Sequence, residues 1–471
     1  MVISQIAKTL WSHKKKSIFA VIATAYGVNA LRARLRDDRI RYSFAERARK
    51  YGLVSFGPAQ RLRRVTVLVN RESGGRRAAD LFKRNALPLL NLAGLQVNVV
   101  ECSLSLSFNV SSASELESLC RVLDNSEADC IFLVGGDGTL SRALVGLSQN
   151  SAPLPIGLFP GGRKNIAFWR IFQSKNQNRD SKSVRMFCES AMALIEGENR
   201  LIYPVKCSIT EEMNDSPSDH QTVNTPNTFW LLSDLCAGWF EHCEQKAPKL
   251  WWWGPLRYKF VYFWEFLKRK PIPLDLRISY EEFCPGCNRC VPPVKQKNLT
   301  TLWSFFSHLL WSSPPDSTKI KVNSDFALVE NPNCGQRREA NVSGANVRLN
   351  VEQTENGSKL KLRVGGAGDA FGRWAAMRFG WNSVGVANGE RKRRGNERDA
   401  QFYVLDIEAS RLELQFTSIP DFVQKLSLAG EWGDFEQYES KKIALETTKA
   451  MGDHQNGAFP LHFYVPKLPL S

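Results

Sequence analysis

The sequence contains the stretch Asp129-Cys130-Ile131-Phe132-Leu133-Val134-Gly135-Gly136-Asp137-Gly138-Thr139. Its apolar run, residues 131–134, has the length and composition of a strand buried on both faces, and the glycines behind it break that strand. Apolar residues then recur with helical spacing. They are Leu140, Ala143, Leu144 and Leu147. The unit is therefore predicted to be a strand, a glycine turn and a helix.

The glycine turn is suited to a polyphosphate ligand. Glycines let the backbone approach a ligand closely, and the N-terminus of the following helix faces an anion with its N–H groups. Asp137 needs a separate explanation, because a carboxylate repels phosphate. It is explained if Asp137 holds a Mg²⁺ ion or takes a proton from a nucleophile. The alternative is a tight turn in which Asp137 only caps the helix, and the residues alone leave both open.

Gly135-Gly136-Asp137-Gly138-Thr139 after an apolar strand resembles the signature shared by diacylglycerol kinase-type lipid kinases, sphingosine kinases and NAD kinases. The resemblance implies ATP and Mg²⁺ as cofactors. It also implies that Asp137 is a catalytic residue and the metal ligand. The rest of the turn is expected to bind the nucleotide phosphates. These residues are Gly135, Gly136, Gly138 and Thr139.

A second glycine loop follows a buried-strand pattern at residues 65–69. The loop reads Asn70-Arg71-Glu72-Ser73-Gly74-Gly75, and residues 78–90 have helical spacing. The diacylglycerol kinase family carries Asn-Pro-x-Ser-Gly-Gly at this place and contacts the nucleotide with it. Arg71 stands where the family has proline. The resemblance implies nucleotide binding by the four matching residues, Asn70, Ser73, Gly74 and Gly75.

A third loop, Pro160-Gly161-Gly162-Arg163-Lys164-Asn165, follows a strand pattern at residues 154–159. It resembles the family's "PIGIIPLGTGND" segment, and the match implies nucleotide binding by Gly162 and Asn165. Arg163 replaces the usual threonine and Ile166 the usual aspartate. The acylglycerol kinases, a mitochondrial branch of the family, also diverge at this loop.

The two cations of this loop have two interpretations. Arg163 and Lys164 either neutralise nucleotide phosphates or are solvated surface cations.

Strand and helix patterns alternate in the first half of the chain, with a further strand at residues 95–100 and a helix at 112–125. This order predicts a largely parallel α/β sheet. Short strand patterns with turn signals then predict a mainly β second domain. They lie at residues 202–209, 229–235, 276–280, 326–329, 360–364, 401–407 and 411–416.

The expected fold is an α/β nucleotide-binding domain followed by a mainly β, sandwich-like lipid-binding domain. The family resemblance implies that the active site lies in the cleft between them. The expected division is a basic arm at 1–60, a catalytic ATP-binding domain at 61–200, a lipid-substrate domain at 201–440 with an insertion near 291–358, and a tail at 441–471.

The net charge of +16 is concentrated in the N-terminal arm. Residues 1–64 hold 15 Lys and Arg residues against three acidic residues, so the rest of the chain carries only +4. This distribution argues against a nucleic-acid groove on the folded body. An apolar stretch at residues 18–31 lies between basic clusters and is short for a membrane span. The arm is typical of a mitochondrial targeting segment or of a retained interfacial membrane anchor, and a disordered basic tail is the remaining alternative.

Three consecutive tryptophans, Trp251-Trp252-Trp253, cannot all face one core. They fit a membrane interface or a lipid-lined pocket, and the alternative is a buried aromatic hairpin. The segment 249–258 resembles the "Trp-Tyr-x-Gly-Pro-Leu-Lys" stretch of acylglycerol kinases.

Acidic residues of the second half are expected near the substrate by resemblance. Glu241 and Glu244 stand where related kinases place a lipid-recognising acid. Glu431 matches the acid of the family's Asp-Gly-Glu turn if Ala429 replaces the aspartate, and Asp434 is the competing candidate. Glu431 is therefore a second catalytic candidate.

Cys284, Cys287 and Cys290 form a Cys-x2-Cys-x2-Cys run. This spacing binds zinc if a fourth ligand comes from elsewhere, and a disulfide is the alternative. The candidates for that ligand are Cys334, Cys236 and His242.

The resemblance implies an ATP- and Mg²⁺-dependent acylglycerol or diacylglycerol kinase that makes lysophosphatidic and phosphatidic acid. It implies a peripheral protein of the mitochondrial inner membrane, on the intermembrane-space side. A sphingosine or ceramide kinase and a non-catalytic scaffold in an inner-membrane protein import complex are the rivals. An NAD kinase is the weakest alternative, because it leaves the basic arm and the tryptophans unexplained.

Overall fold

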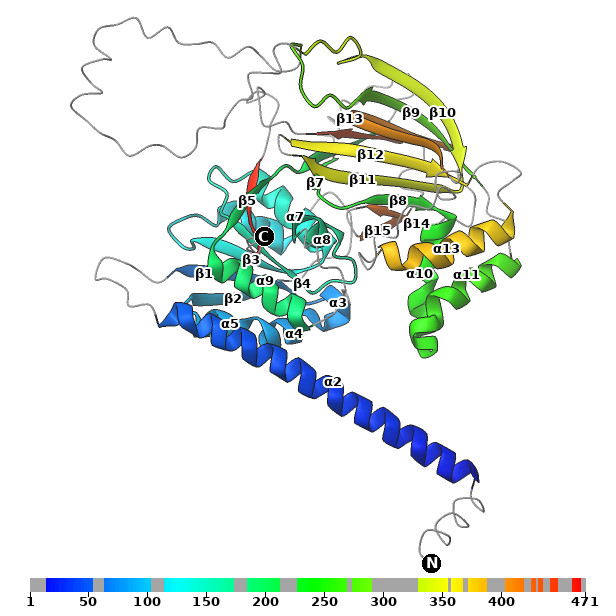
Figure 1. The fold of residues 1–471 in the computed structure, drawn as a ribbon. Coiled ribbons are helices and arrows are strands. Elements are labelled where there is room, and N and C mark those ends of the chain that lie inside the picture. Colours follow the sequence, from blue (N-terminus) through cyan, green and yellow to red (C-terminus); the bar gives the residue numbers. More distant parts are fainter. Residues whose placement is uncertain are drawn as a thin grey trace, which may run out of the picture.

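The structure is a computed structural model (Figure 1). It describes residues 14–53, 63–102, 114–172, 184–211, 227–268, 273–289, 329–354, 357–366, 372–387, 403–418, 425–428, 431–434, 441–447 and 460–466.

The first domain is built on a six-stranded sheet in the order β2-β1-β3-β4-β17-β5. Its first four strands are parallel, and β17 continues the parallel arrangement next to β4 while β5 is antiparallel to β17. The central strands β1, β3 and β4 consist almost wholly of buried residues, as expected for a sheet covered on both faces. The strands are β1 (Arg64–Asn70), β2 (Gln96–Cys102), β3 (Cys130–Gly135), β4 (Ile156–Pro160), β5 (Asn199–Ile202) and β17 (Leu461–Tyr464).

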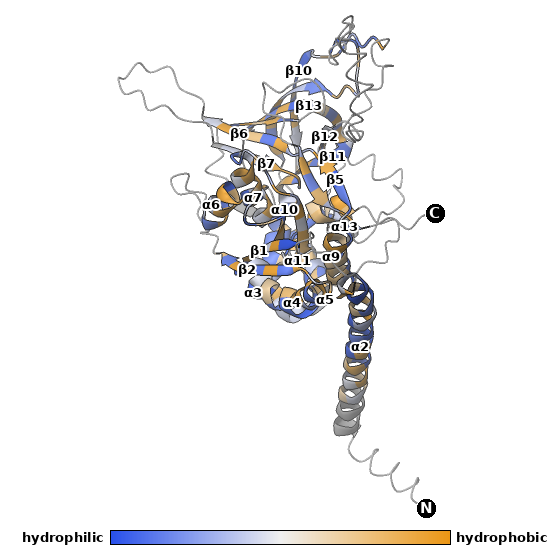
Figure 2. Cartoon of the chain, turned by 90° about the vertical axis from the view of Figure 1, so that its left-hand side faces the viewer, coloured by the Kyte–Doolittle hydropathy of each residue, from blue (hydrophilic) through white to orange (hydrophobic). Residues whose placement is uncertain are grey.

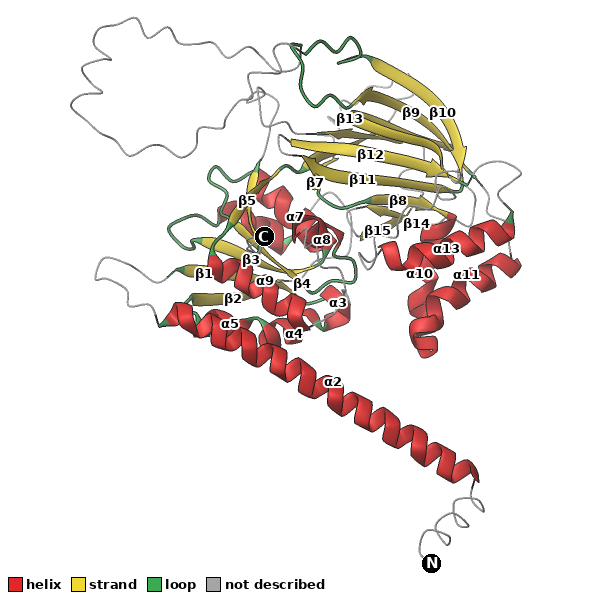
Figure 3. Cartoon of the chain, viewed as in Figure 1, coloured by secondary structure: helices red, strands yellow, loops and turns green. Residues whose placement is uncertain are grey.

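Helices cover both faces of this sheet (Figure 3). One layer holds α4 (Ala78–Asn85), α5 (Leu87–Leu92) and α9 (Val184–Glu196), after the single turn α3 (Ser73–Arg76). The other layer holds α6 (Glu115–Val122), α7 (Asp137–Ser148) and α8 (Ile166–Phe172). Phe159 of β4 stacks on Phe187 of α9 with ring centroids 4.9 Å apart, and this contact joins the sheet to the first layer.

The N-terminal arm is a 39-residue helix, α2 (Lys14–Gly52). At 1.5 Å per residue it is about 60 Å long. Its C-terminal end packs on the first domain, where Ala48 is fully buried and Phe44 contacts the core. Towards its N-terminus it projects away from that domain (Figures 1 and 2). The arm expected at 1–60 is therefore partly an element of the folded first domain.

The second domain is an antiparallel sheet of 11 strands with its own hydrophobic core. Its main path is β15-β14-β8-β11-β12-β13-β16-β6-β7, and β10 pairs with β9, which pairs with β13. The strands are β6 (Val205–Glu211), β7 (Asn227–Leu231), β8 (Leu235–Gly238), β9 (Leu274–Glu282), β10 (Arg337–Gly344), β11 (Asn346–Thr354), β12 (Gly357–Gly365), β13 (Tyr403–Ser418), β14 (Lys425–Leu428), β15 (Glu431–Asp434) and β16 (Lys441–Glu446).

A group of helices lies at one end of this sheet (Figure 3). It comprises α10 (Trp239–Lys246), the 3-10 helix η1 (Ala247–Leu256), α11 (Arg257–Lys268) and α13 (Arg373–Ala387). Trp239 of α10 packs edge-on against Phe240 with ring centroids 5.1 Å apart, and both belong to the second core. The predicted α/β domain and mainly β second domain are thus confirmed.

Several predicted boundaries in the second half are wrong. The strand expected at 202–209 is two strands in different sheets, because the chain crosses between the domains at residues 203–204. The expected insertion is too long, since residues 337–354 supply two strands of the second sheet. Of the strand expected at 326–329, residues 326–328 lie outside the described residues.

The tail expected at 441–471 is also wrong, since the structure uses it in both domains. Strand β16 pairs with β13 and β6 in the second sheet. Strand β17 returns to the first sheet and separates β4 from β5. The chain therefore crosses between the domains twice, once after β5 and once after β16, and the second crossing adds a restraint on their relative position.

Candidate active site

Three loops meet at the carboxyl edge of the first sheet. They follow β1, β3 and β4, which are neighbours in the sheet. The register places Val69 opposite Val134 and Gly135 opposite Pro160, so the strands end at the same level. Parallel strands direct their carboxyl ends to one edge, where ligands bind in open α/β sheets. The three glycine loops of the sequence therefore form one site.

The loop after β1 has an unusual backbone. Gly74, Gly75 and the following Arg76 have φ angles of 63°, 74° and 66°, in the left-handed region. A Cβ atom on Gly74 would lie 2.2 Å from the carbonyl oxygen of Gly161, in the loop after β4. Glycine is therefore required at position 74 by both conformation and space. Ser73 is buried at the start of α3.

The loops after β3 and β4 touch through glycine. A Cβ atom on Gly162 would lie 2.3 Å from the Cα atom of Gly136. The Gly162 N–H donates to the carbonyl oxygen of Gly135 at 3.0 Å, and the Asp137 N–H donates to that of Lys164 at 3.1 Å. These contacts join the turn after β3 and the loop after β4 into one unit.

The carboxylate of Asp137 is buried in this unit and is only 4% exposed. Its oxygens accept backbone N–H groups of Ile166 at 2.8 Å and Ala167 at 3.0 Å, at the start of α8. Burial raises its pKa to about 6, although the two N–H groups oppose the shift. Asp137 thus caps α8, whereas the capping alternative drawn from the sequence concerned its own helix, α7. A cavity beside it is lined by Thr139 and Asn165, among others.

The polar side chains predicted to bind nucleotide also hold the loops together. The Asn70 amide nitrogen donates to the Thr139 hydroxyl at 2.8 Å, and the Asn70 amide oxygen accepts the Glu72 N–H at 3.0 Å. Asn165 makes two bonds to Gly162, accepting from its N–H at 3.1 Å and donating to its carbonyl oxygen at 3.0 Å. Each of these side chains positions a loop at the site.

Gly138 is the second residue of α7. It therefore lies in the first turn of the helix whose N-terminus follows the glycine turn.

The second domain reaches this site through Lys164. Its ammonium group donates to Glu241 of α10 at 2.8 Å and to the Ser427 hydroxyl of β14 at 2.9 Å. Lys164 is thus bonded to the second domain, and the interpretation of it as a solvated surface cation is wrong. Burial lowers its pKa, but Glu241 and Glu244 outweigh that effect and hold the pKa above its usual value.

Glu244 lies near the same lysine. Burial raises its pKa to about 7, and the neighbouring carboxylate of Glu241 adds to the shift. The two acids expected to recognise substrate are therefore both brought to the edge that carries Asp137.

The arginines of the loops differ in their surroundings. Arg71 forms an ion pair with Glu101 at 2.9 Å on the surface. A guanidinium nitrogen of Arg163 lies 3.9 Å from the position that a Cβ atom on Gly75 would take. Arg163 therefore lies over the loop after β1, where a cation can meet a phosphate.

The structure adds a charged cluster that the sequence did not predict. Asp234, before β8, is almost fully buried between Arg170 of α8 and Arg348 of β11. Burial acts to raise its pKa, but the two guanidinium groups outweigh it and lower the pKa. Because Arg170 also donates to the carbonyl oxygen of Val351 at 2.8 Å, this cluster fastens α8 to the second domain. No local pattern in the sequence marks these residues.

Glu431 begins β15 and pairs through its backbone with Leu428 of β14. This hairpin also carries Ser427, so the strand of Glu431 lies near Lys164. Ala429 lies outside the described residues.

The three tryptophans are on the surface. Trp251 and Trp252 are 74% and 63% exposed, so the buried-hairpin alternative is wrong. Other large apolar side chains of this helix group are exposed as well: Trp253, Leu256, Phe263, Trp264, Leu267 and Trp374. In the described part of the chain, no helix combines the length and the hydrophobicity that crossing a bilayer requires.

Comparison with known proteins gives a consistent pattern. Residues 64–195 match the diacylglycerol kinase catalytic domain. An uncharacterized protein of Caenorhabditis elegans, F52C9.3, is 33% identical over 435 residues, which cover 91% of this chain and 90% of that protein. Human mitochondrial acylglycerol kinase is 24% identical over 329 residues, covering 68% of this chain and 70% of that protein. Sphingoid long-chain bases kinase 1 of Arabidopsis thaliana is 32% identical over 113 residues, covering 23% of this chain and 14% of that protein.

Proposed function

Because the chain belongs to the family of lipid kinases with a diacylglycerol kinase catalytic domain, we propose that it phosphorylates monoacylglycerol and diacylglycerol. The γ-phosphoryl group of ATP passes to a free hydroxyl group of the lipid and gives lysophosphatidic or phosphatidic acid. The observation that carries this proposal is the meeting of three glycine loops, Asp137 and the acidic residues of the second domain at one edge of the sheet.

The extent of the similarities supports acylglycerols over sphingoid bases. The match to human acylglycerol kinase spans 329 residues. The part of the chain before the second domain ends with β5 at Ile202, so a match of this length includes part of the second domain. The matches to the sphingoid base kinase and to sphingosine kinase 2 of Arabidopsis thaliana span 113 and 207 residues, which are 23% and 42% of this chain, against 68% for human acylglycerol kinase. The second domain is the part of the molecule in which substrate preference is expected to reside.

The chain's own residues bind and orient the two substrates in this proposal. Phosphoryl transfer depends mainly on positioning and on charge neutralisation. The left-handed loop at Gly74 and Gly75 and the turn at Gly135 and Gly136 offer backbone N–H groups to the nucleotide phosphates. Arg163 supplies a positive charge beside the first of these loops.

The site also fits a magnesium ion. Mg²⁺ takes oxygen ligands and keeps several waters, so one carboxylate together with nucleotide phosphates suffices. Each oxygen of Asp137 accepts one backbone N–H and retains a lone pair. When bound, the ion would neutralise phosphate charge.

Asp137 is the proposed catalytic residue. Without a bound ion its pKa is about 6, so it is mostly ionised at neutral pH and can take a proton from a hydroxyl group, whereas as a ligand of Mg²⁺ it would instead hold the ion. Its hydrogen bonds to α8 hold the carboxylate in one orientation.

Glu241, Glu244 and Glu431 are the proposed lipid-side acids. Lys164 orients Glu241, and the raised pKa of Glu244 makes it a hydrogen-bond donor or acceptor near neutral pH. Such groups suit the hydroxyls of glycerol.

The lipid is supplied by a membrane in this proposal. The exposed tryptophans of η1 and the apolar residues of α11 would enter the bilayer interface, and the cations of α2 would bind anionic lipid. The similarity to mitochondrial acylglycerol kinases supports a mitochondrial location. We propose that the protein lies on the inner membrane, facing the intermembrane space.

The test is phosphate transfer from labelled ATP to monooleoylglycerol in mixed micelles, with sphingosine as a second acceptor. We expect activity towards the acylglycerol and a loss of at least about 100-fold in Asp137→Asn, because the amide cannot take the proton. Asp80→Asn, an exposed carboxyl on α4, is the matched control and should keep full activity.

Three outcomes would contradict parts of the proposal. Preference for sphingosine overturns the substrate class. Equal activity of the wild type and Asp137→Asn overturns the role of Asp137. Folded wild type that transfers no phosphate to either lipid favours the scaffold in a protein import complex.

A further inference from the structure

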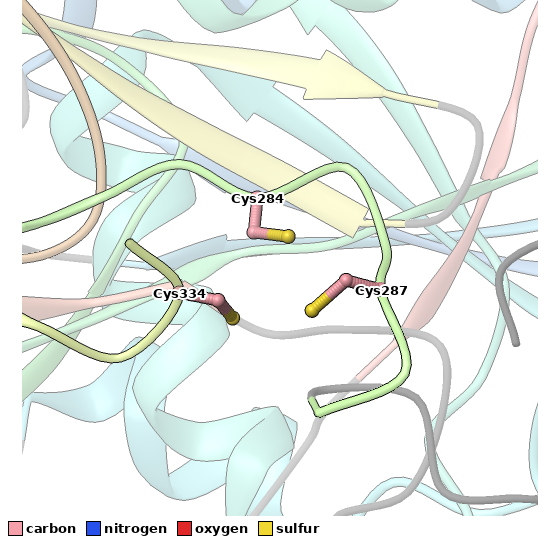
Figure 4. A group of neighbouring side chains, drawn as sticks. All are labelled: Cys284, Cys287 and Cys334. Atoms are coloured by element: carbon pink, nitrogen blue, oxygen red, sulfur yellow. The ribbon is translucent and has the colours of Figure 1, made fainter. Parts of the chain in front are cut away.

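Three cysteines lie together in the second domain, beside β9 and β10, whereas the strands of this domain that belong to the proposed site, β14 and β15, lie at the other side of the sheet. The sulfur atoms of Cys284, Cys287 and Cys334 are all within 4.8 Å of one another. Cys284 and Cys287 are buried and Cys334 is partly buried. Figure 4 shows the three side chains as neighbours that come from two segments of the chain.

The sheet explains why these distant cysteines meet. Strands β9 and β10 are antiparallel neighbours, and Glu281 of β9 lies opposite Arg337 of β10. Cys284 and Cys287 follow the end of β9, and Cys334 precedes the start of β10. The pairing of these strands therefore brings together two cysteine-bearing turns that are far apart in the sequence.

Hydrogen bonds join the two turns around the thiols. The Asn288 N–H donates to the carbonyl oxygen of Val329 at 3.0 Å, and Arg289 donates to that of Pro332 at 3.3 Å. The Asn331 amide nitrogen lies 3.4 Å from the sulfur of Cys284 and donates to it. An N–H group directed at a sulfur stabilises a thiolate, and such outer partners are typical of metal sites.

We propose that Cys284, Cys287 and Cys334 bind a structural Zn²⁺ ion through their thiolates. Zinc prefers tetrahedral sulfur ligands at about 2.3 Å, which places the sulfurs about 3.8 Å apart, within the observed limit. The Cys-x2-Cys spacing followed by a distant cysteine is a usual zinc arrangement. Of the three candidates in the sequence for a further ligand, Cys334 is the one that joins this group, and Cys290 lies outside the described residues.

The ion would fasten the end of the β9–β10 pair. Three thiols release their protons when they bind the ion, so the site carries thiolate charge balanced by Zn²⁺. One position of the tetrahedron remains for a further donor. A disulfide would bond only two of the three sulfurs and leave the position of the third unexplained, whereas a metal ion explains why all three lie together.

The test is the metal content of the full-length protein, purified with a reductant and dialysed against a weak chelator. We expect about one zinc per chain by mass spectrometry of the metals. Each of Cys284→Ser, Cys287→Ser and Cys334→Ser should lose most of it, whereas Cys120→Ala, a buried cysteine of the first domain, should retain it. Wild type without zinc, or with iron in its place, overturns the proposal.

A second measurement does not depend on how the variants fold. Wild-type protein is treated with an alkylating agent before and after zinc is removed by a strong chelator, and the labelled cysteines are mapped. We expect the three thiols to react only after chelation. If they react only after a disulfide reductant is added, a disulfide is present and the zinc site is overturned.

Discussion

The ammonium group of Lys164 lies 2.8 Å from a carboxylate oxygen of Glu241, across the boundary between the two domains. The lysine follows β4 in the α/β domain, and the glutamate belongs to α10 in the second domain. The carbonyl oxygen of the same lysine accepts the N–H of Asp137. One residue therefore connects the proposed catalytic turn to the proposed lipid side.

We expect Glu241→Gln to lower the free energy of unfolding by about 2 kcal/mol, because it leaves a partly buried ammonium without its strongest partner. Lys164→Met combined with Glu241→Gln should cost less than the sum of the two single changes. Chemical denaturation of the four proteins measures this coupling.

The matched control is Glu339→Gln, which removes the carboxylate of an ion pair with Arg277 in which both side chains are more than half exposed. Its effect should stay within about 0.5 kcal/mol. Additive effects of the Lys164 and Glu241 changes would contradict a direct interaction.

Glu244 should make stability depend on pH. Its pKa is about 7 in the folded protein, against an ordinary value of 4.5. The unfolded chain therefore loses this proton at lower pH than the folded one, and the contribution of Glu244 to stability falls as the pH rises from about 4.5 to about 7. The side chain of Glu244→Gln cannot ionise. The free energy of unfolding of this variant relative to the wild type should therefore increase by about 2 kcal/mol when the pH is raised from about 5 to about 8.

Urea unfolding of both proteins at the two pH values measures this difference. Glu339→Gln again serves as the control and should follow the wild type. A constant difference between wild type and Glu244→Gln at the two pH values would show that Glu244 is ionised throughout.

Gly162→Ala should disrupt the contact between the second and third loops. The added methyl group would meet the Cα atom of Gly136 at 2.3 Å, so one of the two loops must move. We expect a loss of about 1–3 kcal/mol in stability and at least about a tenfold loss in kcat/KM for ATP. Gly372→Ala, whose methyl group meets nothing within 4 Å, is the control. Wild-type kinetics in Gly162→Ala would mean that the loop spacing does not matter for phosphoryl transfer.

Trp251→Ala combined with Trp252→Ala should weaken binding to liposomes. The two side chains are largely exposed, and amphipathic aromatic rings favour the membrane interface. We expect several-fold weaker co-sedimentation with phosphatidylserine-containing vesicles. Added salt should weaken the binding further, because the cations of α2 are screened. Leu92→Ala with Val122→Ala, exposed apolar residues of the first domain, is the control. Equal binding by both double variants would remove the tryptophans from the proposed membrane surface.

Much of the first domain was predictable from the sequence. The strands β1, β3 and β4 and their glycine turns are local patterns of a few residues, and buried parallel strands have a recognisable composition. The region expected to be one helix at 78–90 is two helices, α4 and α5, with Pro88 near the start of the second. Proline at that position favours a new helix start.

For the second domain, only the fold class, mainly β, was predictable from the sequence. Short strands were expected, and the structure has them, but residues 403–407 and 411–416 belong to one long strand, β13. The sequence did not reveal β16 and β17, because strands of 6 and 4 residues are too short to show a clear alternation of apolar and polar side chains.

The sequence alone determined the strand–turn–helix units, the glycine positions at their ends and the concentration of positive charge in the arm, because each of these depends on neighbouring residues. Tertiary structure alone decided which distant side chains meet. Lys164 and Ser427 are 263 positions apart and Lys164 and Glu241 are 77 apart, and Cys334 reaches Cys284 only through the pairing of β9 with β10. The physical reason is that such contacts depend on strand order and register, which are set by the packing of the whole core and not by any one segment.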